Sequence, residues 1–559
     1  MPSRTASTSL HNPARAVMIA LVAILTAMPM AGSAQTPVDA TPEATLEATP
    51  EGSGDAPWWQ GAPCYEIFVR SFADSDGDGN GDFRGMTERL DYLNDGTPTT
   101  TTDLGITCIW LMPIMESVSY HGYDVTDYYA VERDYGSIED FLAFMDAAHS
   151  RGIHVIVDLV INHTSVQHPW FVDAARAPGS RYRDWYIFEE TNPGYAGPWG
   201  DVAWHPTPGG SDFYYGVFWS GMPDLDFTNP EVTAEIRAIT EFWLTEMNVD
   251  GFRLDAVKHL IEDGRIQEST PETIAWLENY AAFIQSVKAD AYTVGEVSGA
   301  NSATLDPYYP DTLDQFFHFE LAENALNAAQ SGAPLLLAIT VRNAQEAIPD
   351  ARYATFLTNH DQPRVATRLA GDERAMRVAA MLLLSLPGTP FVYYGEEIGM
   401  SGDKPDELIR TPMQWSAAPS GGFTSGTPWK PLQPDWRERN VETLTGNADS
   451  LLNLYRTWIQ LRTAHPSLMV GTFQELDVEA PAVIASMREY QGERTLVMIN
   501  TGLEPTGDLA IAVPGMDAGN GATDLLRGGP DIQVSVDGTL MVPSLDAGSG
   551  TVLQLSSGS

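Results

Sequence analysis

The sequence is poor in positive charge. Its 31 lysines and arginines are outnumbered by 75 aspartates and glutamates, which gives a formal net charge of -44 at pH 7. A nucleic-acid-binding protein needs a basic surface, so this balance argues against a nucleic-acid partner. It suits a soluble protein that acts on a neutral or cationic substrate. Lysine is especially scarce, so a lysine inside a motif is conspicuous; it occurs at Lys258, Lys288, Lys404 and Lys430.

Cysteine is nearly absent as well. Cys64 and Cys108 each lie in a short apolar run, at residues 64–69 and 106–111. In an exported protein the two could form a disulfide. Two buried thiols in adjacent strands fit the pattern equally well, because free cysteine packs readily in protein cores.

Long apolar runs are missing except near the N-terminus. Residues 16–30 are apolar, basic residues precede them, and Ala31-Gly32-Ser33-Ala34 supplies small residues for cleavage. This pattern predicts an export signal over residues 1–34 and a secreted, extracellular protein. The run is shorter than the ~20 residues that span a bilayer, so we expect no membrane association after cleavage; an uncleaved signal anchor is the alternative. Residues 35–56, rich in Thr, Pro, Ala and Glu, predict an extended linker.

Short apolar runs alternate with longer helical patterns from about residue 57 to residue 468. Strands that alternate with helices pair in parallel, and eight units predict a closed (β/α)8 barrel of the TIM type, in the α/β class. A doubly wound open sheet is the alternative on pattern alone. The apolar runs are near residues 65–70, 107–112, 154–160, 250–255, 292–296, 314–319, 353–358 and 390–394.

Two intervals break this alternation. Residues 164–222 form a long stretch rich in Trp, Tyr, Gly and Pro, typical of a small inserted domain, so the barrel is expected to comprise 57–163 and 223–468. Residues 469–559 show short strands between Gly/Asp turns, which predicts an antiparallel β domain. The insertion contains three tryptophans that could stack on sugars, although such residues more often fill the core of a small domain: Trp199, Trp204 and Trp219.

Charged residues gather where several of the predicted strands end. The segment Gly251 to His259 places Arg253 and Asp255 on one side of a strand, because side chains alternate with period two. Glu296 ends the next strand, and His360-Asp361 follows the seventh. In a barrel these ends meet on one rim, where active sites are built. Alone, Arg253 and Asp255 could be a structural ion pair; several such ends together indicate a catalytic site.

Three carboxylates with an arginine and two histidines suit the cleavage of an acetal. One carboxylate attacks while a second protonates the leaving oxygen, and a retaining enzyme needs these two ~5–5.5 Å apart. The third can stabilise a positively charged transition state. Arg253 would keep the nucleophile ionised, and crowding of like charges would raise the proton affinity of Glu296. His163 and His360 can hydrogen-bond sugar hydroxyls.

These segments resemble the signature regions of the α-amylase family, glycoside hydrolase family 13. The resemblance implies the barrel, a protruding inserted domain (domain B), a C-terminal β-sandwich and a retaining mechanism. It implies Asp255 as nucleophile, Glu296 as acid/base and Asp361 as transition-state stabiliser. The resembling segments are 158–163, 251–259, 294–297, 356–361 and 222–226.

The same resemblance bears on bond specificity. Tyr120-His121-Gly122-Tyr123 is similar to the segment of endo-acting amylases, with Tyr123 as the stacking platform at the cleavage point. Tyr120 stands where enzymes that remove single glucose units usually carry an acid. Ala256 followed by Lys258 and His259 resembles enzymes that cut α-1,4 bonds, where the Lys-His pair contacts the sugar on the leaving side.

We therefore expect a monomeric α-amylase-type enzyme acting on starch, other α-glucans or maltooligosaccharides. Asp226 departs from the asparagine usual among oligo-1,6-glucosidases and neopullulanases, and it leaves their activities open. An α-glucosidase or glucanotransferase of the same mechanism is a further alternative. A catalytically dead carbohydrate-binding homologue is disfavoured, because all three carboxylates are present.

A run of acidic residues predicts a calcium site. Oxygen ligands alternate with small residues from residue 74 to 82, as in the first part of an EF-hand loop. Gly85 stands where the bidentate glutamate would be, so this is no EF-hand; it resembles the calcium loop of the oligo-1,6-glucosidase side of the family. Asn162 could belong to a second Ca²⁺ site beneath the insertion. The expected ligands of the first are Asp74, Asp76, Asp78, Asn80, through its backbone carbonyl, and Asp82.

Overall fold

The computed structural model describes residues 56–528, 532–535 and 538–556. The predicted export signal and all but the last residue of the predicted linker lie outside these residues. Within the described part of the chain, no helix combines the length and the apolar character needed to cross a membrane.

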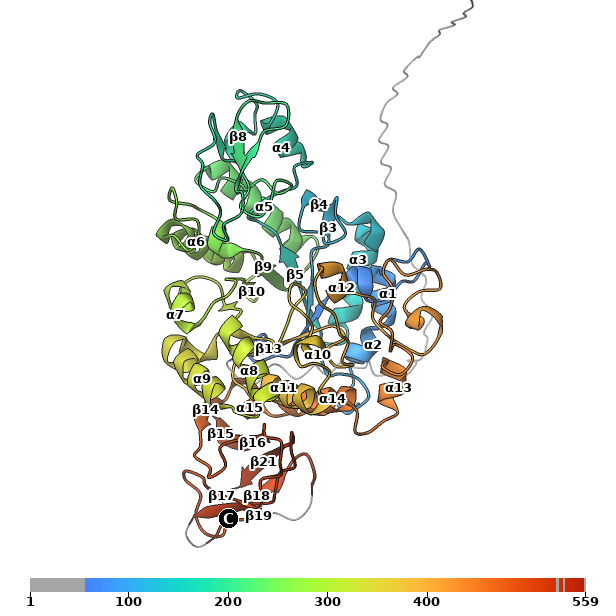
Figure 1. Cartoon of the computed structure of the whole chain (residues 1–559), viewed down its shortest axis with the longest axis vertical. Helices are drawn as coiled ribbons and strands as arrows, with labels where there is room; N and C mark the ends of the chain where they lie inside the picture. The colour runs from blue at the N-terminus through green and yellow to red at the C-terminus, as the bar shows by residue number, and fades with distance from the viewer. Residues whose placement is uncertain (1–55, 529–531, 536–537, 557–559) are drawn as a thin grey trace, which may run out of the picture. The chain divides into compact units, whose positions relative to one another are not determined.

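Eight parallel strands form the central sheet, in the order β11-β10-β9-β5-β2-β1-β13-β12. Figure 1 labels β5, β9, β10 and β13 of this sheet. A parallel bridge between Phe317 and Ala354 joins the two edge strands, and His318 N donates to Ala354 O at 3.0 Å. The sheet therefore closes into a barrel, which confirms the predicted fold and excludes the open sheet. The strands are β1 (Cys64–Ile67), β2 (Cys108–Leu111), β5 (His154–Leu159), β9 (Gly251–Leu254), β10 (Tyr292–Gly295), β11 (Gln315–Phe316), β12 (Ala354–Thr355) and β13 (Thr389–Tyr393).

Close packing of neighbouring strands explains the glycine that begins β9. Gly251 has a φ of 149°, and a Cβ there would lie 1.9 Å from the carbonyl oxygen of Tyr292 on β10. Only glycine tolerates this approach. The register that follows pairs Asp158 of β5 with Arg253 of β9, so their side chains leave the sheet at the same level.

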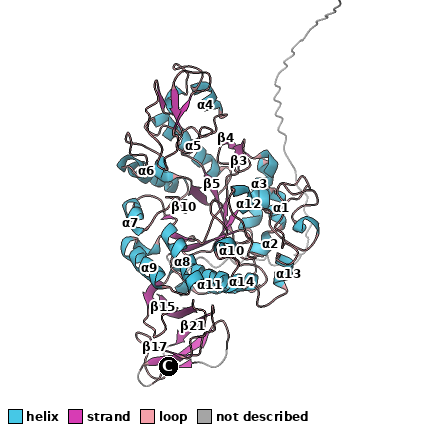
Figure 2. Ribbon diagram, viewed as in Figure 1, coloured by secondary structure: helices cyan, strands magenta, loops and turns pink. Residues whose placement is uncertain are grey.

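Helices lie between consecutive barrel strands (Figure 2). Local signals set their ends: Ser137 and Asp140 form a capping box at the start of α3, and Asn229 caps α5 ahead of Pro230. The helices are α1 (Phe83–Glu88), α2 (Leu90–Leu93), α3 (Ile138–His149), α5 (Pro230–Thr245), α6 (Pro271–Val287), α7 (Ser302–Leu305), α8 (Phe319–Ser331), α9 (Leu335–Ala347), α10 (Val365–Arg368), α11 (Glu373–Ser385) and α14 (Leu451–Ala464). Short helices α12 (Asp406–Ile409), α13 (Val441–Thr445) and α15 (Pro466–Val470) lie in the loops after β13 and after α14.

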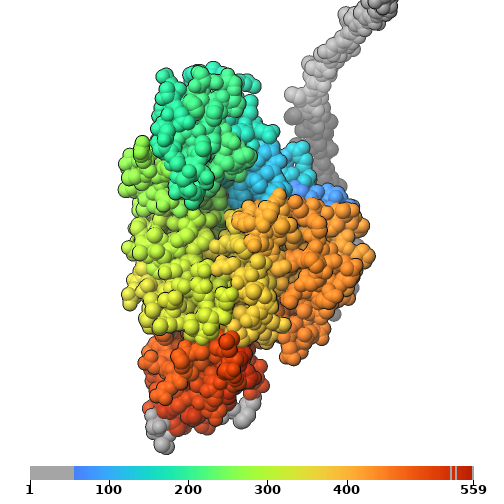
Figure 3. Space-filling model, in the orientation of Figure 1, coloured from blue at the N-terminus to red at the C-terminus, as the bar shows by residue number. Residues whose placement is uncertain are grey.

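The interval between β5 and α5 carries its own small sheet. Its strands β6 (Phe188–Glu189), β8 (Phe213–Tyr215) and β7 (Trp204–Pro206) are antiparallel, and α4 (Pro169–Ala174) precedes them. A separate small core includes Trp204 and Tyr215. In Figure 3 these residues form the teal and green surface. A second excursion, the hairpin of β3 (Met115–Ser117) and β4 (Val125–Val131), follows β2 and carries Tyr120 and Tyr123.

The C-terminal part is antiparallel, as predicted. One sheet has the order β14-β15-β16-β21-β18-β19, and a separate pair, β17-β20, shares its core. Arg488 of β15 is buried and donates to Ser385 O at the end of α11, which ties this part to the barrel helices. The strands are β14 (Thr472–Glu475), β15 (Val483–Tyr490), β16 (Glu493–Asn500), β17 (Leu509–Ala512), β18 (Gly521–Asp524), β19 (Ile532–Gln533), β20 (Thr539–Val542) and β21 (Gly550–Ser556).

The structure resolves the question that the two cysteines left open. Cys64 and Cys108 are register partners at the first positions of β1 and β2, and their sulfurs form a disulfide. Both residues are fully buried. The bond therefore fastens two neighbouring barrel strands at their beginning.

Candidate active site

The charged residues predicted at strand ends lie on one rim of the barrel. Asp255 directly follows β9, Glu296 directly follows β10, and Asp361 lies six residues after β12. His163 follows β5. Because all the barrel strands run parallel, these positions share the carboxyl-terminal end of the sheet, where (β/α)8 enzymes hold their active sites.

Arg253 is the centre of this cluster. Its Nη1 donates to both oxygens of Asp158 at 2.8 Å and to Asp255 Oδ1 at 2.7 Å, while Nη2 donates to Glu296. The guanidinium is only 1% exposed. One buried cation thus binds three carboxylates, and it places Asp255 and Glu296 on either side of itself.

The backbone turns sharply after β9. Ala256 adopts a left-handed conformation with φ 52°, and a 3-10 turn at Val257–His259 follows it. A non-glycine residue in this region is strained, and such strain clusters at functional sites. The turn ends the strand at Asp255, so the carboxylate projects from the rim while Lys258 and His259 lie beside it.

Asp361 has its own pair of cations. Arg410, in the loop after β13, donates from Nη2 to Asp361 Oδ1 at 2.7 Å and from Nε to His360 O at 2.9 Å. His360 Nε2 lies 3.3 Å from Asp361 Oδ2. Partial desolvation by the surrounding residues raises the pKa of Asp361, but His360 and then Arg410 lower it by more, so the carboxylate is ionised. With 48% of its side chain exposed, Asp361 faces the open side of the site.

A buried hydrogen-bonded chain connects the two halves of the cluster. Glu66 Oε1 lies 2.5 Å from His360 Nδ1, His360 Nε2 lies 2.6 Å from Tyr123 Oη, and Tyr123 OH donates to Asp158 Oδ2 at 2.9 Å. Despite burial, Asp361 and Glu66 raise the pKa of His360 to about 9, so at neutral pH it is an imidazolium. It therefore donates to both Glu66 and Tyr123. The chain continues through Asp158 to Arg253.

His163 contacts the backbone of Tyr123. Its Nε2 lies 3.1 Å from the carbonyl oxygen of Tyr123, and its ring packs 5.1 Å from Phe218 of the insertion. Burial lowers the pKa of His163, so the ring is neutral and donates this hydrogen bond. Tyr123 lies parallel to His360 at 5.5 Å, which fixes the plane of the phenol ring.

Lys258 and His259 border the rim beside the insertion. Lys258 Nζ lies 2.9 Å from Glu268 and donates to Ser298 O at 3.3 Å. His259 Nδ1 donates to Gln267 O at 2.8 Å, whereas its buried Nε2 has no hydrogen-bond partner among the described residues. Burial lowers the pKa of His259 to about 4, so the ring is neutral at pH 7 and Nε2 is a hydrogen-bond acceptor.

Tyr120 takes part in a cluster over Arg410. Its ring centroid lies 5.8 Å from the Arg410 guanidinium carbon and 5.3 Å from the Trp429 ring. Asp226, the departure noted in the sequence, accepts from Thr228 N at 2.9 Å and Thr228 Oγ1 at 2.6 Å. These hydrogen bonds form a local turn before α5, so the carboxylate of Asp226 is bound by a residue of its own segment.

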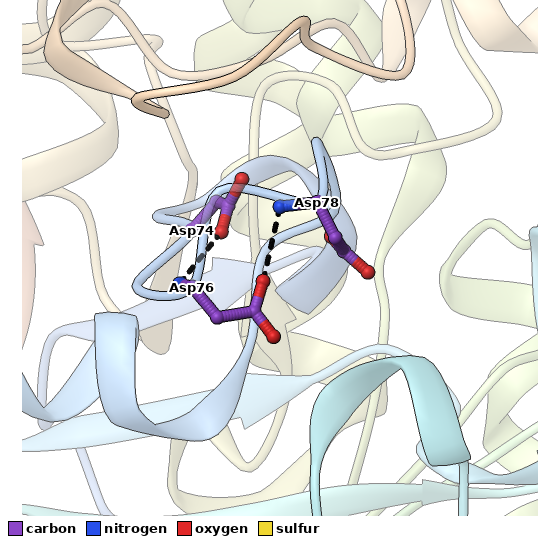
Figure 4. Close-up of side chains that lie close together, drawn as sticks. All are labelled: Asp74, Asp76 and Asp78. Carbon is purple, nitrogen blue, oxygen red and sulfur yellow. Dashed lines mark hydrogen bonds between the residues drawn. The ribbon is translucent and has the colours of Figure 1, made fainter.

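Three aspartates of the acidic loop at 74–82 lie close together (Figure 4). Asp74, Asp76 and Asp78 each offer an oxygen within 4.8 Å of the others. Asp74 accepts from the N–H groups of residues 76, 77 and 79, which orients it inward. Asp82 caps α1 and binds Ser75, and the Asn80 side chain accepts from Arg70, so only its backbone carbonyl remains for an ion. Clustered hard oxygens fit a Ca²⁺ ion.

Two acidic residues that the sequence did not identify, Asp224 and Glu262, lie near Asn162. Asn162 Oδ1, Asp224 Oδ2 and Glu262 Oε1 are buried and lack hydrogen-bond partners among the described residues. Burial raises the pKa of Asp224 to about 7, and burial followed by the nearby Asp224 raises that of Glu262. Unpartnered buried acids are costly. A hard divalent cation would satisfy all three oxygens, so this second set also fits Ca²⁺.

Three residues of this cluster were assigned no role from the sequence, although Asp158 begins the segment 158–163 noted there. Glu66 and Asp158 are acids inside apolar strands. Because a buried acid requires a partner, this position was a signal of function in the sequence. Arg410 comes from a loop after the last strand, 49 residues beyond its partner Asp361. Its only signal is a lone arginine after the apolar Leu408-Ile409 pair.

Comparison with known proteins agrees with this geometry. The family model "Alpha amylase, catalytic domain" matches residues 66–471. Alpha-amylase 3 of Dictyoglomus thermophilum is 39% identical over 452 residues, 79% of this chain and 85% of that protein. Trehalose synthase/amylase TreS of Mycobacterium tuberculosis is 34% identical over 496 residues, 78% and 80%. The oligo-1,6-glucosidase of Parageobacillus thermoglucosidasius is 31% identical over 525 residues, 79% and 90%.

The same likeness holds for a solved structure. An α-amylase from H. orenii superposes with a TM-score of 0.79 at 41% identity, covering 88% of this chain and 99% of that one. The match spans the barrel, whose rim carries the carboxylates and Arg253. This chain therefore belongs to the α-amylase family, glycoside hydrolase family 13, and is a glycosidase.

Proposed function

We propose that this glycosidase is a secreted, monomeric, calcium-binding hydrolase of the α-amylase type. It cuts α-1,4-glucosidic bonds in starch and maltooligosaccharides with retention of configuration. The observation that carries the mechanism is the single buried guanidinium of Arg253 bound to both Asp255 and Glu296. Two carboxylates on one anchor suit the double displacement of a retaining enzyme.

The reaction follows from this arrangement. Asp255 attacks the anomeric carbon while Glu296 donates a proton to the departing glycosidic oxygen, which leaves a glucosyl ester on Asp255. Glu296 then takes a proton from water, and the resulting hydroxide releases the sugar. Asp361, held ionised by His360 and Arg410, stabilises the positive charge on the ring in both transition states. Tyr123 provides the ring on which that sugar stacks.

Three features support internal cleavage of α-1,4 bonds. Ala256 and the Lys258-His259 pair resemble α-1,4-cleaving members. Tyr120 stands in place of the acid usual in enzymes that remove single glucose units, which supports cleavage within the chain. The name Alpha-amylase 3, carried by a relative with 39% identity, points the same way.

An α-glucosidase, an oligo-1,6-glucosidase or a sugar-isomerising synthase is the second candidate. The observation that favours it is the 31–34% identity to proteins with such names across four fifths of the chain. All these reactions begin with the same attack by Asp255. The two glucosidases also release the sugar to water and differ in the bond they cleave, whereas a synthase returns the sugar to a sugar hydroxyl.

Product analysis separates the candidates. Purified protein is incubated with starch, maltotriose, isomaltose and trehalose, and early products are resolved by chromatography. The proposal expects mixed maltooligosaccharides from starch at the first time points. Glucose as the sole initial product from starch, or conversion of trehalose to maltose without hydrolysis, would overturn it.

Variants test the assigned roles directly. Asp255→Asn and Glu296→Gln should each lower kcat on starch by about a thousandfold or more without lowering Tm. Asp290→Asn, an exposed aspartate before β10 at the other end of the barrel, is the control and should retain activity. Near-native turnover in either active-site variant contradicts the mechanism.

A further inference from the structure

A cavity lies at the end of the barrel opposite the catalytic rim. Its volume is about 460 Å³, and part of its wall comes from Gly61, Ala351 and Gly388, which precede strands β1, β12 and β13 in the chain. The rest of the wall includes residues of α9, α15 and β14, three elements that are labelled close together in Figure 1. Because the catalytic carboxylates follow the strands, this cavity is separate from the site that cleaves the sugar.

Arg488 of β15 lines this cavity with a guanidinium that is almost fully buried. Its Nη1 donates to Ser385 O at 2.9 Å, and its Nη2 donates to Gly471 O at 3.1 Å. Its Nε donates to Thr472 O at 3.2 Å. A guanidinium has five N–H groups, so these bonds to described residues leave one N–H on each terminal nitrogen. Such a pair is the one that binds a carboxylate or phosphate through two parallel hydrogen bonds.

A second buried arginine lies beside the first. Arg462 of α14 donates to Gly388 O at 2.6 Å and to Leu386 O at 3.1 Å. Both arginines therefore bind carbonyl groups in or just after the last turn of α11, where helix carbonyls lack intrahelical partners. Among the described residues, no carboxylate forms a salt bridge with either guanidinium. The carbonyl dipoles balance part of the positive charge, and no negative side chain balances the remainder.

The local electrostatics show the cost of this arrangement. Burial lowers the pKa of Arg488 to about 10, and burial followed by the charge of Arg488 lowers the pKa of Arg462. Both side chains still carry their charge at pH 7. The hydroxyl of Tyr353 is buried near both arginines and has no hydrogen-bond partner among the described residues. Because a buried charge without a partner is costly, an anion bound in the cavity would stabilise the fold.

The cavity wall indicates which kind of anion fits. Pro387, Met469 and Phe473 provide apolar surface, and the volume is larger than an inorganic oxyanion needs. Asp350 is the only acid among the described residues that line the cavity; it is exposed and forms no salt bridge with Arg488. A charged group beside apolar walls suits a small organic molecule with one anionic end.

We propose that this cavity is an oxyanion site, in which a carboxylate or phosphate group pairs with the two remaining N–H groups of Arg488. The surrounding walls hold the organic body that carries this group. Since Arg488 belongs to the C-terminal sheet and the opposite wall belongs to the barrel, the bound anion joins these two parts. The site acts on the stability of the fold and takes no part in bond cleavage.

Benzoate and benzamide test the site, because they share a shape and differ in charge. Isothermal titration calorimetry of the whole protein should show saturable binding of benzoate, and benzamide should bind at least tenfold more weakly. Inorganic phosphate should compete with benzoate, whereas chloride at the same ionic strength should not. Benzoate should also raise Tm more than benzamide does, because a ligand bound only to the folded state stabilises it.

Variants locate the binding. Arg488→Lys keeps the charge but loses the paired N–H groups, so the affinity for benzoate should fall at least tenfold. Arg374→Met is the matched control: Arg374 also donates to backbone carbonyls, those of Thr501 and Ala329, but it does not line the cavity. If Arg488→Lys does not fold, Val470→Phe keeps the arginine and fills part of the cavity, and it should weaken benzoate binding to a similar extent.

Asp55→Asn distinguishes two sources of the oxyanion. Asp55 precedes Ala56, which lines the cavity, so a carboxylate of the chain itself has the same chemistry as a free ligand. Benzoate binding to wild type supports a free ligand, and binding only after Asp55→Asn supports the oxyanion site with the chain's own carboxylate as occupant. The site is refuted if benzoate binds neither protein, if benzamide binds equally well, or if Val470→Phe and Arg488→Lys bind benzoate as wild type does.

Discussion

Replacing Glu66 by glutamine tests the buried chain that organises the site. Glu66 is 1% exposed and its carboxylate lies 2.5 Å from His360 Nδ1. Glu66→Gln keeps the shape and an accepting oxygen but removes the negative charge. The substitution therefore isolates the electrostatic part of the contact.

The magnitude follows from the titration of His360. A pKa raised from about 6.5 to about 9 corresponds to about 3 kcal/mol of favourable interaction with the charged ring. Asp361 and Glu66 share it, so removing the charge of Glu66 should cost about 1 to 2 kcal/mol. Because the pKa is raised in the folded state, this stability is fully present below pH 6.5 and is lost as pH rises through 9.

Two measurements check the prediction. Denaturant unfolding from pH 6 to 10 should show Glu66→Gln less stable than wild type at pH 6.5, with the difference shrinking toward pH 10. The alkaline limb of the kcat/KM profile should move to lower pH by about one unit. Glu493→Gln, which alters the His465–Glu493 pair of the C-terminal part, is the control and should leave the activity profile unchanged.

Parallel stability curves for wild type and Glu66→Gln across this range would refute the reasoning. They would mean that His360 is neutral, or that the charge of Glu66 does not stabilise its protonated form. An unmoved alkaline limb together with a stability difference would show that the imidazolium matters for folding and has no part in turnover.

Two further predictions concern Arg410 and the metal ligands. Arg410→Lys cannot bind Asp361 Oδ1 and His360 O together, so kcat should fall about tenfold to a hundredfold with little change in KM; steady-state kinetics showing only a KM change contradict this. Calcium chelation should lower the Tm of wild type, because an ion bound only to the folded state stabilises it. Glu262→Gln should reduce the shift, and calorimetry giving equal Tm values with and without calcium contradicts the site.

The barrel could be predicted from the sequence because each strand is a short apolar run between helical segments. All eight predicted runs contain the observed strands or overlap them. The polar strand ends then located Asp255, Glu296 and Asp361 on one rim. The order of these residues along the chain was sufficient to place them together, since parallel strands align their carboxyl-terminal ends.

The sequence could not predict side-chain contacts between loops that are distant along the chain. Arg410 reaches Asp361 only because the loop after β13 folds back over the rim, and no local pattern encodes that path. Glu262 follows the catalytic segment closely, yet its relation to Asn162 depends on how the insertion folds over β5. The disulfide remained open for the same reason: apolar neighbours predict burial of Cys64 and Cys108 and say nothing of their register.

The closure of the barrel has a consequence for how the enzyme would lose activity on heating. β11 and β12 contain two residues each and meet through one bridge, so this seam is the least hydrogen-bonded boundary between barrel strands. Glu296 lies on one side of the seam, anchored through Arg253 to β9, and Asp361 lies on the other, anchored through Arg410 to the loop after β13. If β11 and β12 separated at this seam, Glu296 and Asp361 would move apart while the helices and the C-terminal sheets stay folded. Inactivation would then be a local, reversible event that precedes global denaturation.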